Sequence, residues 1–184
     1  MTASACSLPF LRPTTPATAT VGGTPVSRSL YDVLLASAKH QVGTGGASLD
    51  PSQPAGARRL ARVQASAMRT ALRDTALERL AAGKGVTVSK DEIDAAIARV
   101  DQALGTSASL DGQLTQSGLS RASFRVLMRF RLLERRLRAL DPGLEKAIAS
   151  TLANGDVHVY AAPCLDDHRY PQCLDAVTAG YKID

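Results

Sequence analysis

Apolar residues along the chain recur mainly at the three- and four-residue spacing of amphipathic helices. This helical pattern predicts five helices, at about residues 27–41, 57–82, 89–104, 120–140 and 142–152. Alternation at 19–26 and 156–162 predicts two short strands, and Gly22 and Gly23 supply a turn that needs positive φ. The pattern predicts a mostly α fold: an orthogonal bundle of about five helices with a small β element, formed by an N-terminal and a C-terminal strand.

The predicted helix at 89–104 has the clearest start signal in the chain. Ser89 and Glu92 form a capping box, in which each side chain accepts a hydrogen bond from the other residue's backbone N–H. The apolar positions of this helix make one narrow stripe, which predicts that a single face is packed. Residues 43–56 and 105–118 are rich in helix breakers and are predicted to be loops.

The predicted helix at 120–140 carries two apolar stripes instead of one. At 100° per residue, the core-facing stripe contains Val126, Phe130, Leu133, Leu137 and Leu140. The second stripe, on the opposite side, contains Phe124, Met128 and Leu132. Arginines flank it on both edges: Arg125, Arg129 and Arg136 on one, and Arg131, Arg135 and Arg138 on the other.

The charge of the chain is concentrated in this one helix. Among residues 120–140 there are seven arginines and one glutamate, whereas the whole chain of 184 residues has a net charge of +5. The remainder is therefore close to neutral, which differs from the widespread positive charge of a general nucleic-acid-binding protein. Aromatic residues make up only 4% of the chain, and the apolar content of 45% suits helices packed on helices.

The second stripe has three interpretations. In the first, Phe124, Met128 and Leu132, together with Arg125, Arg129, Arg131 and Arg135, bind extended segments of unfolded polypeptides. In the second, a neighbouring helix covers the stripe and the arginines are merely solvated. In the third, helix 120–140 is the DNA-recognition helix of a helix-turn-helix, although the predicted loop at 105–118 is too long for the tight turn of that motif.

Motifs of enzyme active sites are absent from the sequence. There is no P-loop, no dinucleotide-binding glycine motif after a strand and no H-E-x-x-H motif. His40 and His158 have no nucleophile or carboxylate at a useful spacing. Several acidic residues are expected in helix caps or on exposed faces, namely Asp74, Glu78, Asp91, Glu92 and Asp94. We therefore expect no cofactor, no metal site and no catalytic residue in this chain.

The three cysteines leave several possibilities open. Cys164 and Cys173 lie nine positions apart and are suited to a small disulfide loop in an oxidising compartment, or they are two free thiols. A zinc site of these two cysteines and His168 lacks an evident fourth ligand. Ala3-Ser4-Ala5-Cys6 resembles the end of a bacterial lipoprotein signal, which makes Cys6 a candidate for lipidation. Otherwise, residues 1–18 form a flexible leader without an intact export signal.

Three segments, in order, carry a resemblance to a known family. They are Thr20-Val-Gly-Gly-Thr-Pro-Val-Ser27, Gly83-Lys-Gly-Val-Thr-Val-Ser-Lys-Asp-Glu-Ile-Asp94, and Gly118-Leu-Ser-Arg-Ala-Ser-Phe-Arg125 before the arginine-rich helix. Over residues 19–140 the chain resembles the SurA N-terminal domain, the chaperone part of SurA/PrsA-type foldases. Asp156-Val-His-Val-Tyr-Ala-Ala162 is similar to the first strand of the parvulin-type peptidyl-prolyl isomerase domain that often follows it.

This resemblance implies an organisation and a function. Residues 1–18 would be a leader, 19–152 the helical chaperone domain, and 153–184 a strand and tail like the start of a parvulin domain. Where that strand usually carries a catalytic histidine, this chain has Ala161, so isomerase activity is not expected. The family context implies an extracytoplasmic, ATP-independent chaperone for unfolded exported polypeptides, attached to a membrane only through a lipid anchor. The alternative that it leaves is an inactive remnant or partner of a full-length isomerase.

Overall fold

The computed structural model of the chain describes residues 19–105, 109–154 and 157–159. These residues form six helices and three short strands, and the mostly α fold with a small β element is confirmed. In chain order the elements are β1 (Ala19–Val21), β2 (Thr24–Pro25), α1 (Arg28–Thr44), α2 (Pro54–Gly83), α3 (Lys90–Leu104), α4 (Leu110–Gln116), α5 (Arg121–Leu140), α6 (Leu144–Asn154) and β3 (Val157–Val159).

The strands form one antiparallel sheet in the order β2-β1-β3. The β1–β2 hairpin turns at Gly22 and Gly23, whose φ angles of 53° and 77° confirm the expected need for glycine. On the other edge of β1, Thr20 lies opposite His158 of β3. The predicted N-terminal and C-terminal strands therefore pair with each other, and this pairing brings the two ends of the described chain together beside α2.

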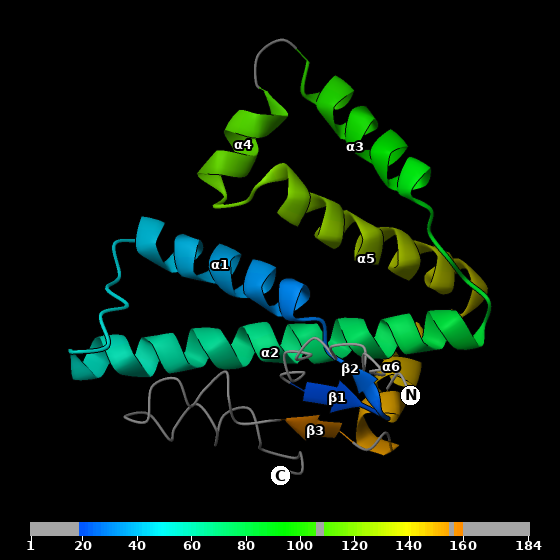
Figure 1. The fold of residues 1–184 in the computed structure, drawn as a ribbon, viewed down its shortest axis with the longest axis horizontal. Coiled ribbons are helices and arrows are strands. Elements are labelled where there is room, and N and C mark those ends of the chain that lie inside the picture. The colour runs from blue at the N-terminus through cyan, green and yellow to red at the C-terminus, as the bar shows by residue number, and fades with distance from the viewer. Residues whose placement is uncertain (1–18, 106–108, 155–156, 160–184) are drawn as a thin grey trace, which may run out of the picture.

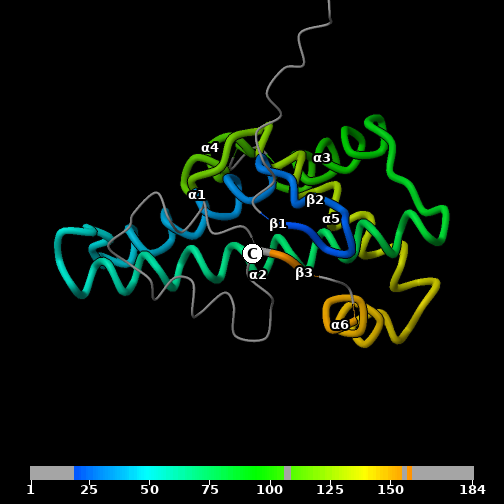
Figure 2. Tube along the Cα trace, turned by 60° about the horizontal axis from the view of Figure 1, so that its bottom comes forward, coloured from blue at the N-terminus to red at the C-terminus, as the bar shows by residue number. Residues whose placement is uncertain are grey.

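The long helix α2 is the central element of the fold (Figure 1). Its 30 residues correspond to a length of about 45 Å. The sheet and α6 lie on one side of it in Figure 1, whereas α1 and α5 lie on the other. Figure 2 also shows α6 on the side of α2 opposite to α1 and α5. Many of its buried residues are alanines, including Ala61, Ala65 and Ala71. Small side chains allow neighbouring helices to approach closely, which explains how one helix can contact so many elements.

The main hydrophobic core surrounds α2. Its fully buried side chains come from four helices and the sheet, and include Leu30, Met68, Leu72, Leu77, Leu137, Leu144 and Val21. From α5, Phe130, Leu133 and Leu137 are buried in this core, and Val126 is partly buried against it, as predicted. Leu140 is the exception: 63% of it is exposed, because α5 ends there and the chain turns away at Asp141.

α3 and α4 form an outer layer on α5, away from α2 (Figure 1). α3 begins with the predicted capping box: the Glu92 N–H donates to Ser89 Oγ at 3.2 Å, and the Ser89 N–H donates to Glu92 Oε2 at 2.8 Å. A second, smaller apolar cluster joins this layer to α5. Its buried residues are Ile97 from α3 and Leu110 and Leu114 from α4.

The prediction of a continuous loop at 105–118 was wrong, because this segment contains α4. Ser109 caps that helix by accepting a hydrogen bond from the Gly112 N–H at 3.0 Å. The turn from α4 into α5 rests against α1, where His40 Nε2 donates to the Gln116 carbonyl oxygen at 2.8 Å. Gly118 has a φ of 67°, and a Cβ at this position would lie 2.5 Å from the His40 side chain, so only glycine fits there.

Candidate functional site

α5 lies between the two layers and uses both of its apolar faces. One face is buried in the core around α2, as described above. On the opposite face, Phe124 and Met128 pack against the small α3–α4 cluster but remain only partly buried. Leu132 is buried, with 8% of its surface exposed. Helix periodicity therefore located the two stripes, and the tertiary structure buries their members to different extents.

A groove runs between α3 and α5, and we call it the α3–α5 groove. Its volume is about 640 Å³, which is within the usual range for sites that bind small ligands or a few side chains. The floor is apolar and the rim is charged. The lining residues are Ala96, Arg99, Val100, Met128, Arg131, Leu132, Glu134, Arg135 and Arg138.

A second groove, the α2–α5 groove, lies on the other side of the same ridge. Its volume is about 660 Å³. Its lining is also mainly apolar, but the buried carboxyl group of Asp74 lies in its wall. Its lining residues are Leu34, Thr70, Arg73, Asp74, Leu119, Phe124, Leu127, Met128, Phe130, Arg131 and Glu134.

Met128, Arg131 and Glu134 line both grooves. They are spaced three residues apart on α5, so they form a ridge along one side of the helix. The two grooves are therefore neighbours, separated by this ridge. Of the predicted polypeptide-binding residues, Phe124, Met128, Leu132, Arg131 and Arg135 all line at least one groove.

The arginines on the first edge of the second stripe are all engaged in ion pairs. Arg125 pairs with Asp94 of α3, and Arg136 pairs with Glu92 of α3. Arg129 pairs with Glu78 of α2. Arg125 and Arg129, both predicted to bind a polypeptide, therefore hold α5 to its neighbours and line neither groove.

The arginines on the other edge are mostly free of such partners. Arg131 and Arg135 are exposed and make no ion pair or hydrogen bond with any residue in the described part of the chain. Arg138 is the engaged member of this edge, because it contacts Glu134 at 2.8 Å and Glu145 of α6 at 2.9 Å. The sequence placed the six arginines on two edges of the stripe, but it could not show which of them form ion pairs with carboxylates.

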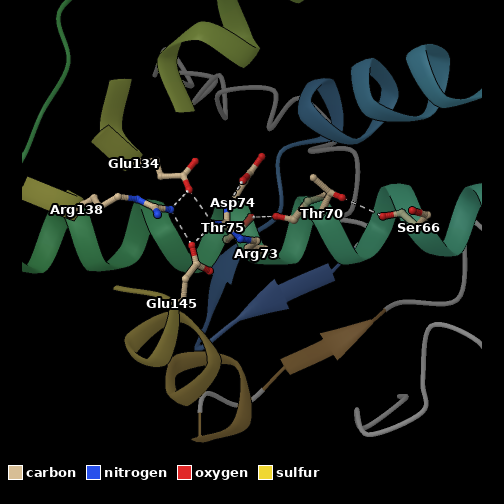
Figure 3. A network of polar contacts seen from close by, with 9 residues as sticks. Ser66, Thr70, Arg73, Asp74, Thr75, Glu134, Arg138 and Glu145 are labelled. Carbon is tan, nitrogen blue, oxygen red and sulfur yellow. Dashed lines mark hydrogen bonds and ion pairs between the residues drawn. The ribbon is translucent and has the colours of Figure 1, made fainter. Parts of the chain in front are cut away.

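A polar network joins α2, α5 and α6 beside the α2–α5 groove (Figure 3). Arg73 Nη2 donates to Glu134 Oε1 and to Glu145 Oε1, at 2.9 Å each. Desolvation of Glu134 opposes its ionisation, but the hydrogen bonds from Arg73 and Arg138 outweigh this and lower its pKa. Glu134 is therefore ionised at neutral pH, and its charge is balanced within the protein.

The predicted position of Asp74 was also wrong. We expected it in a cap or on an exposed face, but only 8% of it is exposed. Burial raises its pKa to about 6, although Arg73, whose Nη1 is 3.6 Å from Asp74 Oδ1, acts in the opposite direction. Because α2 is buried on most of its circumference in this region, helical periodicity could not distinguish an outward position from an inward one.

The structure changes the argument about helix-turn-helix DNA binding. Because only a short turn separates α4 from α5, the length of the loop before α5 no longer excludes this motif. However, α5 is packed between α2 on one side and α3 on the other (Figure 1), whereas a recognition helix needs a free face to enter the major groove. Five of its seven arginines are also paired with carboxylates. The arrangement therefore does not favour DNA binding.

Some predicted features lie outside the described residues: Cys6, Cys164, His168, Cys173 and Ala161. Among the residues that are described, no three histidine, cysteine, aspartate or glutamate side chains are grouped so as to hold a metal ion. A search of the same residues finds no helix with the length and apolar character needed to cross a membrane.

Among the comparisons with known proteins, one family model matches this chain. No curated protein and no solved structure gives a significant match to this chain. The family model described as the SurA-like N-terminal domain matches residues 9–138, which is more than half of the sequence. This match includes all three segments that carried the resemblance and extends through α5 almost to its end. The chain belongs to the SurA-like N-terminal domain family.

Proposed function

We propose that this chain is an ATP-independent chaperone module that binds unfolded or partly folded exported polypeptides in the two grooves beside α5. Membership of the SurA-like N-terminal domain family is consistent with the binding of polypeptides in general. The observation that carries the finer proposal is the ridge of α5: Met128 lies on it between two open grooves with apolar floors. Open apolar grooves of this size suit short extended segments, and methionine adapts to side chains of different shapes.

Light scattering tests this binding. It measures the aggregation of an unfolded protein with and without a stoichiometric amount of the chain. Suppressed scattering supports the proposal, and unchanged scattering contradicts it. The groove variant is Phe124→Ser with Met128→Ser, which should weaken suppression because both side chains line the grooves. Leu132 is left intact because it is buried, and replacing it would also destabilise the fold.

The control for this experiment is Leu140→Ser. Leu140 is the large apolar side chain that the described residues leave most exposed, and it lines neither groove. It should therefore have little effect on suppression. If Leu140→Ser weakens suppression as much as the groove variant does, the binding surface lies elsewhere. Thermal unfolding of both variants verifies that any loss of suppression is not a loss of folding.

The location and the chemistry of the terminal segments belong to the same proposal. We place the chain outside the cytoplasm, as the family context suggests, with Cys6 as a candidate lipid attachment site and Cys164–Cys173 as a candidate disulfide. Cell fractionation, metabolic labelling with a fatty acid and thiol counting under denaturing conditions test these three points separately. An isomerase assay on a proline-containing peptide tests the expectation that this chain has no isomerase activity, and we expect no rate increase.

A further inference from the structure

The two grooves differ in how their charge is balanced. In the α3–α5 groove, three guanidinium groups form no ion pair with a carboxylate of the described residues: Arg99, Arg131 and Arg135. The hydrogen bond that Arg99 makes is from its Nε to the Ala95 carbonyl oxygen on its own helix, at 3.2 Å. The positive charge of this rim is thus available to a partner.

The carboxylates near this groove are already committed. Glu134 lines it but accepts hydrogen bonds from Arg73 and Arg138. Asp74 is buried in the other groove and pairs with Arg73. Elsewhere on α5, arginines are matched one by one with acidic residues of α2, α3 and α4. Because the other arginines of α5 are paired, the unpaired positive charge around the α3–α5 groove indicates that a bound partner supplies the balancing negative charge.

The floor of the groove restricts the chemistry of this partner. Ala96, Val100, Met128 and Leu132 give it an apolar surface between the guanidinium groups. A phosphate or a lipid headgroup would use the rim and leave the floor uncovered. A polypeptide segment in which acidic and aliphatic side chains are neighbours would cover the floor and also neutralise the rim.

We propose that the α3–α5 groove selects client segments in which Asp or Glu lies beside aliphatic residues, with Arg99, Arg131 and Arg135 binding the carboxylates. This inference rests on the proposed chaperone function and adds to it a preference by charge. The α2–α5 groove is lined by two arginines, Arg73 and Arg131, and by two carboxyl groups, those of Asp74 and Glu134, so its lining has no such excess of positive charge. Arg131 belongs to the ridge between the grooves and forms an ion pair with neither of these carboxyl groups.

The experiment measures fluorescence anisotropy of a labelled peptide of alternating Glu and Leu with the full chain. A second peptide carries Gln in place of Glu. The test variant is Arg131→Gln with Arg135→Gln. The matched control is Arg58→Gln with Arg62→Gln, because these are also two exposed arginines, four residues apart on a helix, without ion pairs to any described residue. Both variants lose the same charge, and neither removes an ion pair or a hydrogen bond between described residues.

We expect the acidic peptide to bind more tightly than the Gln peptide and to lose affinity as salt is raised from about 50 to about 500 mM. Arg131→Gln/Arg135→Gln should weaken its binding by about three- to tenfold, whereas the control should change it less than about twofold. Binding of the Gln peptide should respond to neither variant.

Several results would overturn the proposal. Equal losses in both double variants would show that net charge acts without a defined groove, and equal binding of the two peptides would show that carboxylates are not selected. An unfolded client protein is measured in parallel. If that client binds while the acidic peptide does not, only the charge preference fails; if neither binds, the chaperone function fails as well. Binding of an oligonucleotide or of anionic vesicles that depends on Arg131 and Arg135, without peptide binding, would assign the groove to those anions instead.

Discussion

The core around α2 and the outer layer of α3 and α4 are held together in different ways. Around α2, completely buried side chains such as Leu72, Leu77 and Leu144 come from several elements and form one large cluster. In the outer layer, the buried part of the apolar cluster consists of Ile97, Leu110 and Leu114. Burial of apolar surface is the dominant stabilising contribution in proteins, so the α2 region should be much the more stable of the two.

Ion pairs do not make up for the smaller cluster of the outer layer. α5 is joined to α3 and α4 by Arg121–Asp111, Arg125–Asp94 and Arg136–Glu92. All of these side chains are more than a third exposed, and exposed ion pairs stabilise a fold only weakly because water and salt screen their charges. They set the position of α3 and α4 on α5 more than they stabilise it. The α3–α5 groove therefore lies on the border between a firmly packed region and a weakly packed one.

The largest expected effect comes from removing a core leucine. Leu77→Ala should lower the free energy of unfolding by about 2–5 kcal/mol, because Leu77 of α2 is completely buried in the main core. Leu114→Ala removes the same atoms from the outer layer and should cost about 1–2 kcal/mol, since the smaller cluster can give way locally. Urea unfolding followed by circular dichroism measures both. Equal costs would mean that the two regions unfold as one unit and do not differ in stability.

The next effect concerns the buried carboxyl group of the α2 region. The pKa of Asp74 is about 6 in the folded protein, against 3.8 for a free side chain, so ionising it destabilises the fold. Its contribution to stability is most favourable below about pH 4 and is lost as the pH rises through about 6. Asp74→Asn should therefore raise the free energy of unfolding by about 2 kcal/mol at pH 7.5 and by almost nothing at pH 4.

The control for this effect is Asp91→Asn, which removes the same charge from an exposed position on α3. The measurement is urea unfolding at a series of pH values. A difference between Asp74→Asn and the unmodified protein that stays constant from pH 4 to 7.5 would show that Asp74 does not titrate as its burial requires.

A smaller effect is expected at the start of α3. Ser89→Ala removes the side-chain oxygen of the capping box and should cost about 1 kcal/mol. Because the outer layer is the weaker region, the loss should appear as faster hydrogen exchange in α3 and leave α2 unchanged. Ser66→Ala, at an exposed position within α2, is the matched control. Equally faster exchange in α2 would mean that α3 does not open independently.

The smallest effect is the coupling within single ion pairs, measured by double-mutant cycles. For Arg125–Asp94, in the outer layer, we expect about 0.5 kcal/mol, decreasing in high salt. For Arg73–Glu134, where both side chains are less than a third exposed, the coupling should be about 1 kcal/mol and less sensitive to salt. A larger coupling in the outer layer would indicate that charge, and not apolar packing, holds α3 and α4 in place.

Sequence signals from neighbouring residues predicted most helices and strands, but they did not predict α4. The capping box of α3, the glycine turn between β1 and β2 and the two stripes of α5 are all properties of neighbouring residues, which explains why they were predicted. α4 has only seven residues and a glycine in its interior, so propensity does not indicate a helix there. It forms because Leu110 and Leu114, four positions apart, are buried against α3 and α5.

The sequence alone determined the family, the helical class and the face of α5 on which a site could form, because periodicity and caps are encoded within a few neighbouring residues. Only the tertiary structure decided which arginines of α5 remain available and that Asp74 is buried. An ion pair such as Arg129–Glu78 joins residues 51 positions apart, and burial depends on what packs against a helix from elsewhere in the chain. Charge balance and solvent access are properties of the assembled layers, and these define the two grooves.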